Sequence, residues 1–466
     1  MRRSMIVVLT ALVVACAGSP AKKRPDDLAA PPAVAAGGAF PSTYRADTTE
    51  SFVIRGATVL TGDGARIDGG DVWLEGGTVK AVGKVDDAPG ARVIDGKGKW
   101  VTPGIIDAHS HLGVYPSPGV WATSNGNEAT SPNTAEVWAE HSIWPQDPGF
   151  QAARENGGIT TLLVLPGSAN LFGGRGVTLH NVPATTYQAM KYPGAPHVLK
   201  MACGENPRRV YGRDRKSPPS TNMANVAGYR AAFSKAKVYG RKWKKWKDDK
   251  DGPAPDRDLQ LETLAGVLNG EILVQNHCYR ADEMATMLDV AQEAGYKIYA
   301  FHHAVEAYKI ANQLAQAGTC VATWADWWGF KLESFDGIRE NAAMVHTARG
   351  TGCAIIHSDS AGGIQRLNQE TAKAMAAGER AGIRIAPEQA IRWITSNPAK
   401  AIGIGDRTGT LRPGLAADVV VWSADPFSVY SRPDLVLVDG VVRFDRSKPR
   451  GEPESDFMLG LPGGQP

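Results

Sequence analysis

Two histidines separated by one serine, His109 and His111, stand at the end of an apolar run in the segment GIIDAHSHLG, residues 104–113. Asp107 precedes this pair by two residues, so the three side chains share one face if the segment is a β-strand. Two neutral imidazoles on one face can hold one divalent cation. The pair alone does not establish a metal site, because histidine pairs also pack inside protein cores.

Other metal-capable side chains stand at the ends of later apolar segments. ILVQNH ends at His277, IYAFHH ends at His302 and His303, and AIIHSD ends at Asp359. If these segments are parallel strands of one barrel, their carboxyl ends meet at the face where such barrels build active sites. The pattern therefore predicts a metal site assembled from several strand ends. A regular strand would point His302 and His303 to opposite faces.

A lysine lies in the middle of another apolar segment, HVLKMACG, where Lys200 would have no contact with solvent. Burial disfavours a charged amine, so this side chain would lose its proton readily. A neutral amine can take up carbon dioxide and become a carbamate, whose two oxygens can bridge two cations. Glu205 is the rival carboxylate ligand, but it follows Gly204 in a predicted loop. We therefore favour Lys200.

The elements that would position these residues alternate along the middle of the chain. Between residues 101 and 404, short apolar segments are followed by helical stretches such as ADEMATMLDVAQEAG. Such alternation over this length predicts a parallel (β/α)8 TIM barrel. Short strand-like segments in 51–100 and again in 405–450 predict a small β-sandwich domain built from both ends of the mature chain. The predicted fold class is α/β.

The first twenty residues, MRRSMIVVLTALVVACAGSP, have the features of an export signal. Two arginines precede an apolar run that is too short to span a bilayer. VVAC resembles the bacterial lipobox, which predicts a lipoprotein signal peptide over residues 1–15 and lipidation of Cys16. Ala17 favours sorting to the outer membrane, on the periplasmic side of the cell envelope. Residues 16–50 read as a disordered tether, and residues 451–466 read as a tail.

Composition limits the classes of partner. The 466 residues carry a formal net charge of +3, whereas a nucleic-acid-binding protein usually has a strong basic excess. No nucleic-acid partner is expected, and membrane contact is expected through the lipid anchor only. The basic run KVYGRKWKKWKDDKD is interpreted as a solvated insertion. Four further cysteines in apolar segments are predicted to be free thiols that form no metal site: Cys203, Cys278, Cys320 and Cys353.

Taken together, PGIIDAHSHLG, the lysine within a strand, the later strand-end histidines and the strand-end aspartate resemble the amidohydrolase superfamily. The likeness covers residues 51–445. TGTLRPGLAADVVVW is similar to the sandwich domain of that superfamily, and TSNPAKAIGI is similar to the helix after its barrel. The branch that the sequence resembles is the imidazolonepropionase-like amidohydrolases, some of which are dipeptidases.

The resemblance implies a role for each candidate residue. The implied metal ligands are His109, His111, Lys200, His277, His303 and Asp359. His109 and His111 would bind the more buried metal, and a carbamylated Lys200 would bridge to a second one. Asp359 would also be the catalytic base that takes a proton from the attacking water. Two zinc ions are expected, with manganese or iron as alternatives. His357, which shares a face with Asp359, is interpreted as packing beside the site.

The implied function is a metal-dependent hydrolase that cleaves an amide C–N bond with metal-activated water. A dipeptide, an N-acyl amino acid and a cyclic amide are the small-molecule substrates considered. A single-metal deaminase and a non-catalytic ligand-binding lipoprotein on a degenerate barrel are the alternatives. Arg280 would bind a substrate carboxylate or form a surface ion pair. Trp327 would wall the pocket or anchor its loop. His180 is left unassigned, and a homo-oligomer is left open.

Overall fold

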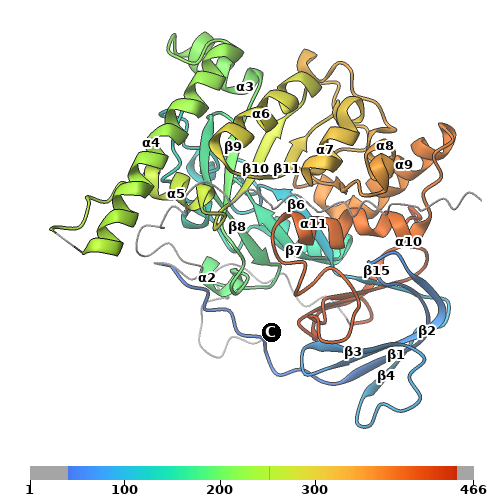
Figure 1. Ribbon diagram of the computed structural model, residues 1–466. Helices are drawn as coiled ribbons and strands as arrows, with labels where there is room; N and C mark the ends of the chain where they lie inside the picture. The colour runs from blue at the N-terminus through green and yellow to red at the C-terminus, as the bar shows by residue number, and fades with distance from the viewer. Residues whose placement is uncertain (1–39, 251, 449–466) are drawn as a thin grey trace, which may run out of the picture.

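Two eight-stranded sheets organise the chain in the computed structural model, which describes residues 40–250 and 252–448. One sheet curls into a barrel with helices around it, and the other lies below the barrel in Figure 1. The predicted signal peptide, Cys16, residues 17–39 of the predicted tether and the predicted tail lie outside the described residues. Residues 40–50 of that tether are described, and the prediction of disorder is wrong there because Tyr44 is 6% exposed and bonds Asp439.

The barrel strands follow one another around the barrel in chain order. They are β6 (Ile105–Ser110), β7 (Ile159–Val164), β8 (Phe172–His180), β9 (Val198–Ala202), β10 (Leu273–Cys278), β11 (Ile298–His303), β12 (Cys320–Thr323) and β13 (Ala354–Ile356). Their residues are almost all buried, as expected for strands that are covered on both faces. The predicted TIM barrel is confirmed.

One strand of the barrel runs against the others. β8 pairs antiparallel with both β7 and β9, whereas the other neighbouring pairs are parallel. Only residues 165–171 connect β7 to β8. A parallel crossover needs a dozen or more residues, so this short connection imposes a hairpin. His180, at the end of β8, therefore lies at the base of the barrel, where it stacks between Tyr44 and Tyr192.

Helices cover the outside of the barrel. They are α1 (Pro148–Gly157), α2 (Tyr187–Met190), α3 (Glu205–Pro207), α4 (Asn222–Asp249), α5 (Leu259–Leu268), α6 (Ala281–Ala294), α7 (Ala311–Ala317), α8 (Asn341–Thr347), α9 (Leu367–Arg380), α10 (Pro387–Ala390) and α11 (Ser396–Ala401). In α6, the buried Met284, Met287 and Ala291 recur at helical spacing and form its inner face. Gly295 ends this helix with φ of +84°, a left-handed conformation that glycine adopts without strain.

The second sheet combines both ends of the described chain. Its strands are β1 (Phe52–Leu60), β2 (Arg66–Glu75), β3 (Thr78–Gly83), β4 (Arg92–Asp95), β5 (Trp100–Pro103), β14 (Val419–Trp422), β15 (Pro433–Val438) and β16 (Val441–Asp445). β5 precedes the barrel and pairs antiparallel with β14, which follows it, with Thr102 opposite Val420. The expected β domain built from both ends is therefore present.

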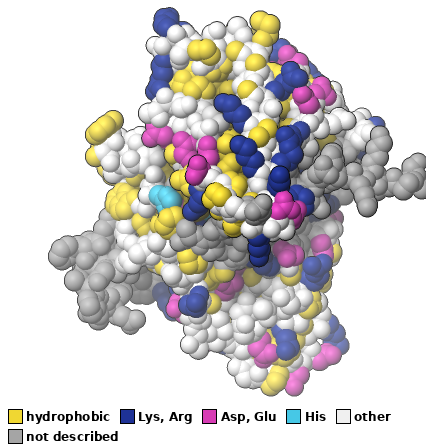
Figure 2. All heavy atoms as spheres, turned by 60° about the vertical axis from the view of Figure 1, so that its left-hand side comes forward, with side chains coloured by type: hydrophobic (Ala, Val, Ile, Leu, Met, Phe, Trp, Pro, Cys, Tyr) yellow, Lys and Arg dark blue, Asp and Glu magenta, His cyan; other side chains and the backbone are white. Residues whose placement is uncertain are grey.

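The basic run lies in the second half of α4, which is a regular helix. Tyr239 and Trp243 are buried on one face, whereas Arg241, Lys242 and Lys245 are exposed on the other. Lysine and arginine side chains gather in a band on this side of the molecule, with acidic side chains beside them (Figure 2). No helix among residues 40–250 and 252–448 combines the length and apolar character that crossing a membrane requires.

The four cysteines of the described residues form two disulfides, so the expectation of free thiols is wrong. Cys203 pairs with Cys278, and Cys320 pairs with Cys353. Their Cα atoms lie 5.2 and 4.6 Å apart, a separation that a disulfide spans. The physical reason is strand adjacency: β9 lies beside β10, and β12 lies beside β13. An apolar segment in the sequence does not show which strand will lie beside it, so the partner of each cysteine could not be predicted.

Candidate metal and catalytic site

A polar cavity of about 410 Å³ opens at the carboxyl ends of the barrel strands. Its lining residues are His109, His111, Ser168, Lys200, Glu205, Asn206, Arg209, His277, Tyr279, His303, Phe330, Lys331 and Asp359. All six residues that the sequence resemblance implied as metal ligands are among them. The barrel thus brings together side chains that are far apart in the chain.

β6 supplies two imidazoles that face the carboxylate of Asp359. Nε2 of His111 lies 3.1 Å from Oδ1 of Asp359, and Nε2 of His109 lies 3.5 Å from the same oxygen. Nδ1 of His111 donates a hydrogen bond of 2.8 Å to the carbonyl of Leu165. Because a carbonyl only accepts, Nδ1 of His111 carries a hydrogen, and Nε2, which faces the carboxylate, is the ring nitrogen placed to bind a metal. Such a group of acceptors suits a divalent cation.

Backbone geometry turns two strand-end residues into the cavity. His303 has φ of +70° and Asp359 has φ of +52°, a left-handed conformation that costs a non-glycine residue free energy. The backbone N–H of Asp359 also donates to the carbonyl of His109 at 3.0 Å. Burial would raise the pKa of the Asp359 carboxyl, but the hydrogen bond and the charge of His111 outweigh this effect and lower that pKa.

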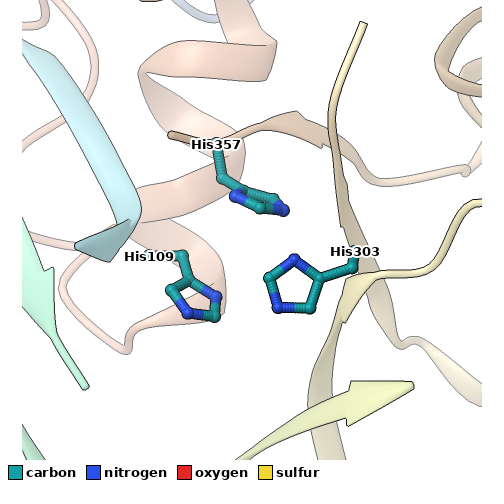
Figure 3. Close-up of side chains that lie close together, drawn as sticks. All are labelled: His109, His303 and His357. Carbon is teal, nitrogen blue, oxygen red and sulfur yellow. The ribbon is translucent and has the colours of Figure 1, made fainter. Parts of the chain in front are cut away.

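His109, His303 and His357 point toward one another at the centre of the site (Figure 3). One ring nitrogen from each lies within 4.8 Å of the others. Nδ1 of His277, Nδ1 of His303 and both ring nitrogens of His357 are buried without a hydrogen-bond partner. Buried polar atoms are normally satisfied, so these unpartnered nitrogens fit a site built to hold metal ions.

His357 is a member of this cluster that the sequence interpretation placed outside the ligand set. Its position two residues before Asp359 was the available signal, because residues two apart share a face of a strand. Its ring stacks on that of His109 at 5.2 Å between centroids. Burial lowers the pKa of His357 to about 3, so the ring is neutral near pH 7.

Lys200 contacts the histidine cluster directly. Nζ of Lys200 is 3.2 Å from Nε2 of His109, and the lysine is 1% exposed. Burial lowers the pKa of Lys200 to about 7. Glu205 begins α3, beyond the strand, and its carboxylate is 3.7 Å from Nζ of Lys331. The geometry therefore favours Lys200 over Glu205 as the residue that reaches the imidazoles.

A regular β11 would point His302 and His303 to opposite faces, but the strand is not regular at His303, and both rings lie near His109. The His109 ring lies 4.7 Å from the His302 ring and 4.8 Å from the His303 ring, centroid to centroid. The strand is regular up to His302, which faces the barrel axis. The positive φ at His303 then breaks the alternation and turns this second ring inward as well.

The two predicted substrate-binding residues do not line the cavity. Arg280 caps the start of α6 with a half-exposed side chain that bonds Asp282 at 3.1 Å. Trp327 is 48% exposed and packs on Trp324, which in turn stacks on His303 at 4.5 Å. Arg280 is held by the first turn of α6, and Trp327 is held by its own loop.

Arg209 and Lys331 supply the positive charge of the cavity wall instead. Lys331 lies over the ring of Tyr279 at 3.9 Å and pairs with Glu333 at 2.7 Å. Phe330 precedes it on the wall. This wall therefore offers a substrate both charged and aromatic contacts.

Comparison with known proteins gives three consistent matches. Residues 275–443 match the model of the Amidohydrolase family. An amidohydrolase structure from Thermotoga maritima MSB8 is 34% identical, with a TM-score of 0.77, over 85% of this chain and 100% of that one. The structure of molinate hydrolase, 17% identical over 85% of this chain and 95% of that one with a TM-score of 0.51, shares the fold.

Two curated relatives extend over most of this chain. Amidohydrolase tasK of Hapsidospora irregularis is 30% identical over 425 residues, which are 84% of this chain and 42% of that protein. This chain thus spans less than half of the length of tasK. Imidazolonepropionase of Geobacillus thermodenitrificans is 24% identical over 396 residues, 77% of this chain and 84% of that protein.

The disulfide Cys203–Cys278 is expected to support the site, because it joins the carboxyl ends of β9 and β10, next to His277. Replacing both cysteines by alanine should weaken zinc binding about tenfold, as loss of a supporting contact typically does. Zinc affinity is measured by competition with a chromophoric chelator.

The matched control is the double replacement of Cys320 and Cys353, which removes a disulfide at the opposite end of the strands. Both variants should lose stability, but this one should keep the zinc affinity of the parent protein. Equal zinc affinities in the two variants would contradict the expectation.

Proposed function

Because the chain belongs to the amidohydrolase family, we propose that it is a metal-dependent hydrolase that cleaves an amide C–N bond of a small molecule. The observation that carries the proposal is the convergence of four histidines, Lys200 and Asp359 in one cavity. The buried rings of His277 and His303 support it, since Nδ1 of each has no hydrogen-bond partner among the described residues.

The residues of the cavity would hold two divalent metal ions. His109, His111 and Asp359 form one group. The rings of His277 and His303, whose centroids are 4.7 Å apart, would form the other, with Lys200 as a ligand to both ions. Zinc suits these nitrogen and oxygen donors, and manganese or iron are alternatives. When bound, such ions would polarise the substrate carbonyl and make water a stronger acid.

Lys200 would supply an anionic ligand after reaction with carbon dioxide. Its neutral amine forms a bond from Nζ to the carbon of CO₂ and releases one proton, which leaves a carbamate with two oxygens. Burial of the amine supports this step, because it lowers the pKa of Lys200 to about 7 and so populates the neutral form. A carbamate also replaces a buried cation beside the metal site by an anion.

Asp359 would move the proton. Its carboxylate, ionised because its pKa is lowered, lies within 3.5 Å of Nε2 of both His109 and His111. It can accept the proton of the attacking water and deliver it to the leaving amine nitrogen. The cavity of about 410 Å³ is compatible with a dipeptide, an N-acyl amino acid or a cyclic amide.

Replacement of Asp359 by asparagine is expected to lower turnover about a hundredfold or more, because an amide cannot accept the proton. Metal content should fall far less, since the amide oxygen can still occupy the ligand position. Turnover is measured on a panel of dipeptides and N-acyl amino acids, and Asp282→Asn, on the surface of α6, is the control. Near-normal turnover of Asp359→Asn would place the base elsewhere.

Replacement of Lys200 by alanine should remove the second metal and most of the activity. Metal content per chain is measured by elemental analysis, with Glu205→Gln as the matched variant that keeps both metals. Short carboxylic acids should restore part of the activity by supplying the missing oxygens. Two metals and full activity in Lys200→Ala would transfer the bridging role to Glu205.

The metal content of the parent protein separates the alternative functions. One metal per chain would favour a single-metal deaminase, and none would favour a non-catalytic ligand-binding protein.

We propose that the protein is anchored by a lipid at Cys16 to the periplasmic side of the cell envelope. The lipobox-like sequence supports this proposal, and so do the two disulfides, which persist in oxidising compartments. Cys16→Ser should yield an active protein that fractionates without membranes. Recovery of this variant with membranes, or a mature N-terminus at another residue, would refute the anchor.

A further inference from the structure

The buried ring of His109 has its two nitrogens in different surroundings. Nε2 faces the cavity, 3.2 Å from Nζ of Lys200 and 3.5 Å from Oδ1 of Asp359. Nδ1 faces away from the cavity and lies 2.9 Å from Nδ1 of His302. A ring nitrogen binds a metal only when it carries no hydrogen, so the position of the His109 hydrogen decides whether Nε2 can act as a ligand.

A backbone carbonyl determines how the side chains of Gln275 and His302 are oriented. The amide nitrogen of Gln275 donates a hydrogen bond of 2.8 Å to the carbonyl of Ala401, at the end of α11. Because that carbonyl only accepts, the nitrogen of the amide must face Ala401 and Oε1 must face the other way. Oε1 lies 2.7 Å from Nε2 of His302. Since this oxygen also only accepts, Nε2 of His302 carries the hydrogen.

The same reasoning, applied to His302, determines which nitrogen of His109 carries the hydrogen. A second proton on His302 would create a cation on a ring that is fully buried, with Gln275 and His109 as its hydrogen-bond partners; burial makes this unfavourable. Nδ1 of His302 is therefore bare and accepts a hydrogen bond. Its partner, Nδ1 of His109, must donate, which leaves Nε2 of His109 without a hydrogen and facing the cavity.

We infer that Gln275 and His302 are positioning residues, which fix the tautomer of His109 by connecting its ring to the carbonyl of Ala401. His111 has a similar arrangement, since its Nδ1 donates to the carbonyl of Leu165 and its Nε2 faces Asp359. The inference rests on the proposed function in one respect: the bare Nε2 matters because a metal is expected there. Partners that fix a ring in this way typically change metal affinity about 10- to 100-fold.

Two pairs of variants test the inference through zinc affinity. Gln275→Met removes the amide at similar volume, and its matched control is Gln260→Met, which removes a similar amide bond to the carbonyl of Asn133 away from the cavity. His302→Leu removes the acceptor beside His109. His302→Asn is the conservative variant, because its side-chain oxygen can take the place of Nδ1 and accept from His109.

Zinc affinity is measured by chelator competition on protein shown to be folded by thermal unfolding. Gln275→Met and His302→Leu should bind zinc about 10- to 100-fold more weakly, whereas Gln260→Met and His302→Asn should match the parent protein. A purely structural role would instead weaken His302→Asn as much as His302→Leu. If Gln275→Met does not fold, the two His302 variants decide. Folded Gln275→Met or His302→Leu with parental affinity would overturn the inference.

Histidine ring ¹⁵N spectra of the parent protein give a second readout that needs no metal. The His109 signals, identified by their loss in His109→Asn, should show the hydrogen on Nδ1. A hydrogen on Nε2 would overturn the inference. If the parent protein binds no zinc, the proposed function fails, while these spectra still decide the tautomer.

Discussion

The barrel closes between its first and last strands through the buried carboxylate of Asp107. This carboxylate accepts hydrogen bonds from the backbone N–H groups of His109 and Ser358 and from the hydroxyl of Ser358. The N–H of Asp359 adds a bond to the carbonyl of His109, so the site carboxylate is fixed by the same closure. A buried donor left without its acceptor costs about 1–3 kcal/mol. The position of Asp359 beside β6 therefore depends on this junction.

Much of the site follows from the sequence, because its residues lie where regular strands end. Period-two alternation places His109 and His111 on one face, and burial of a strand explains the displaced pKa of Lys200. Continuous apolar segments between helical ones are sufficient to predict a barrel. Once a barrel is predicted, the carboxyl ends of its strands must share one face, and this convergence of remote residues needs no further information.

The remaining features depend on local backbone conformation and on which elements become neighbours. The inward turn of His303 requires a positive φ. A glycine in the sequence would have indicated such a backbone conformation, but a histidine does not. The antiparallel course of β8 follows from a short connection inside a segment without helical periodicity. The side chain of Arg280 is held by Asp282 at the start of α6, and that of Trp327 packs on Trp324. Arg209 and Lys331 reach the cavity from segments that carry no metal-capable pattern.

The N-terminal end of the described chain is attached to the base of the barrel. The hydroxyl of Ser42 donates to the carbonyl of Lys191, and the hydroxyl of Tyr44 donates to Asp439. These contacts lie before β9 and at the end of β15, on the side opposite to the carboxyl ends where the cavity opens. The first described residues therefore pack on the side opposite to the cavity, and in that place they leave its mouth open to small molecules.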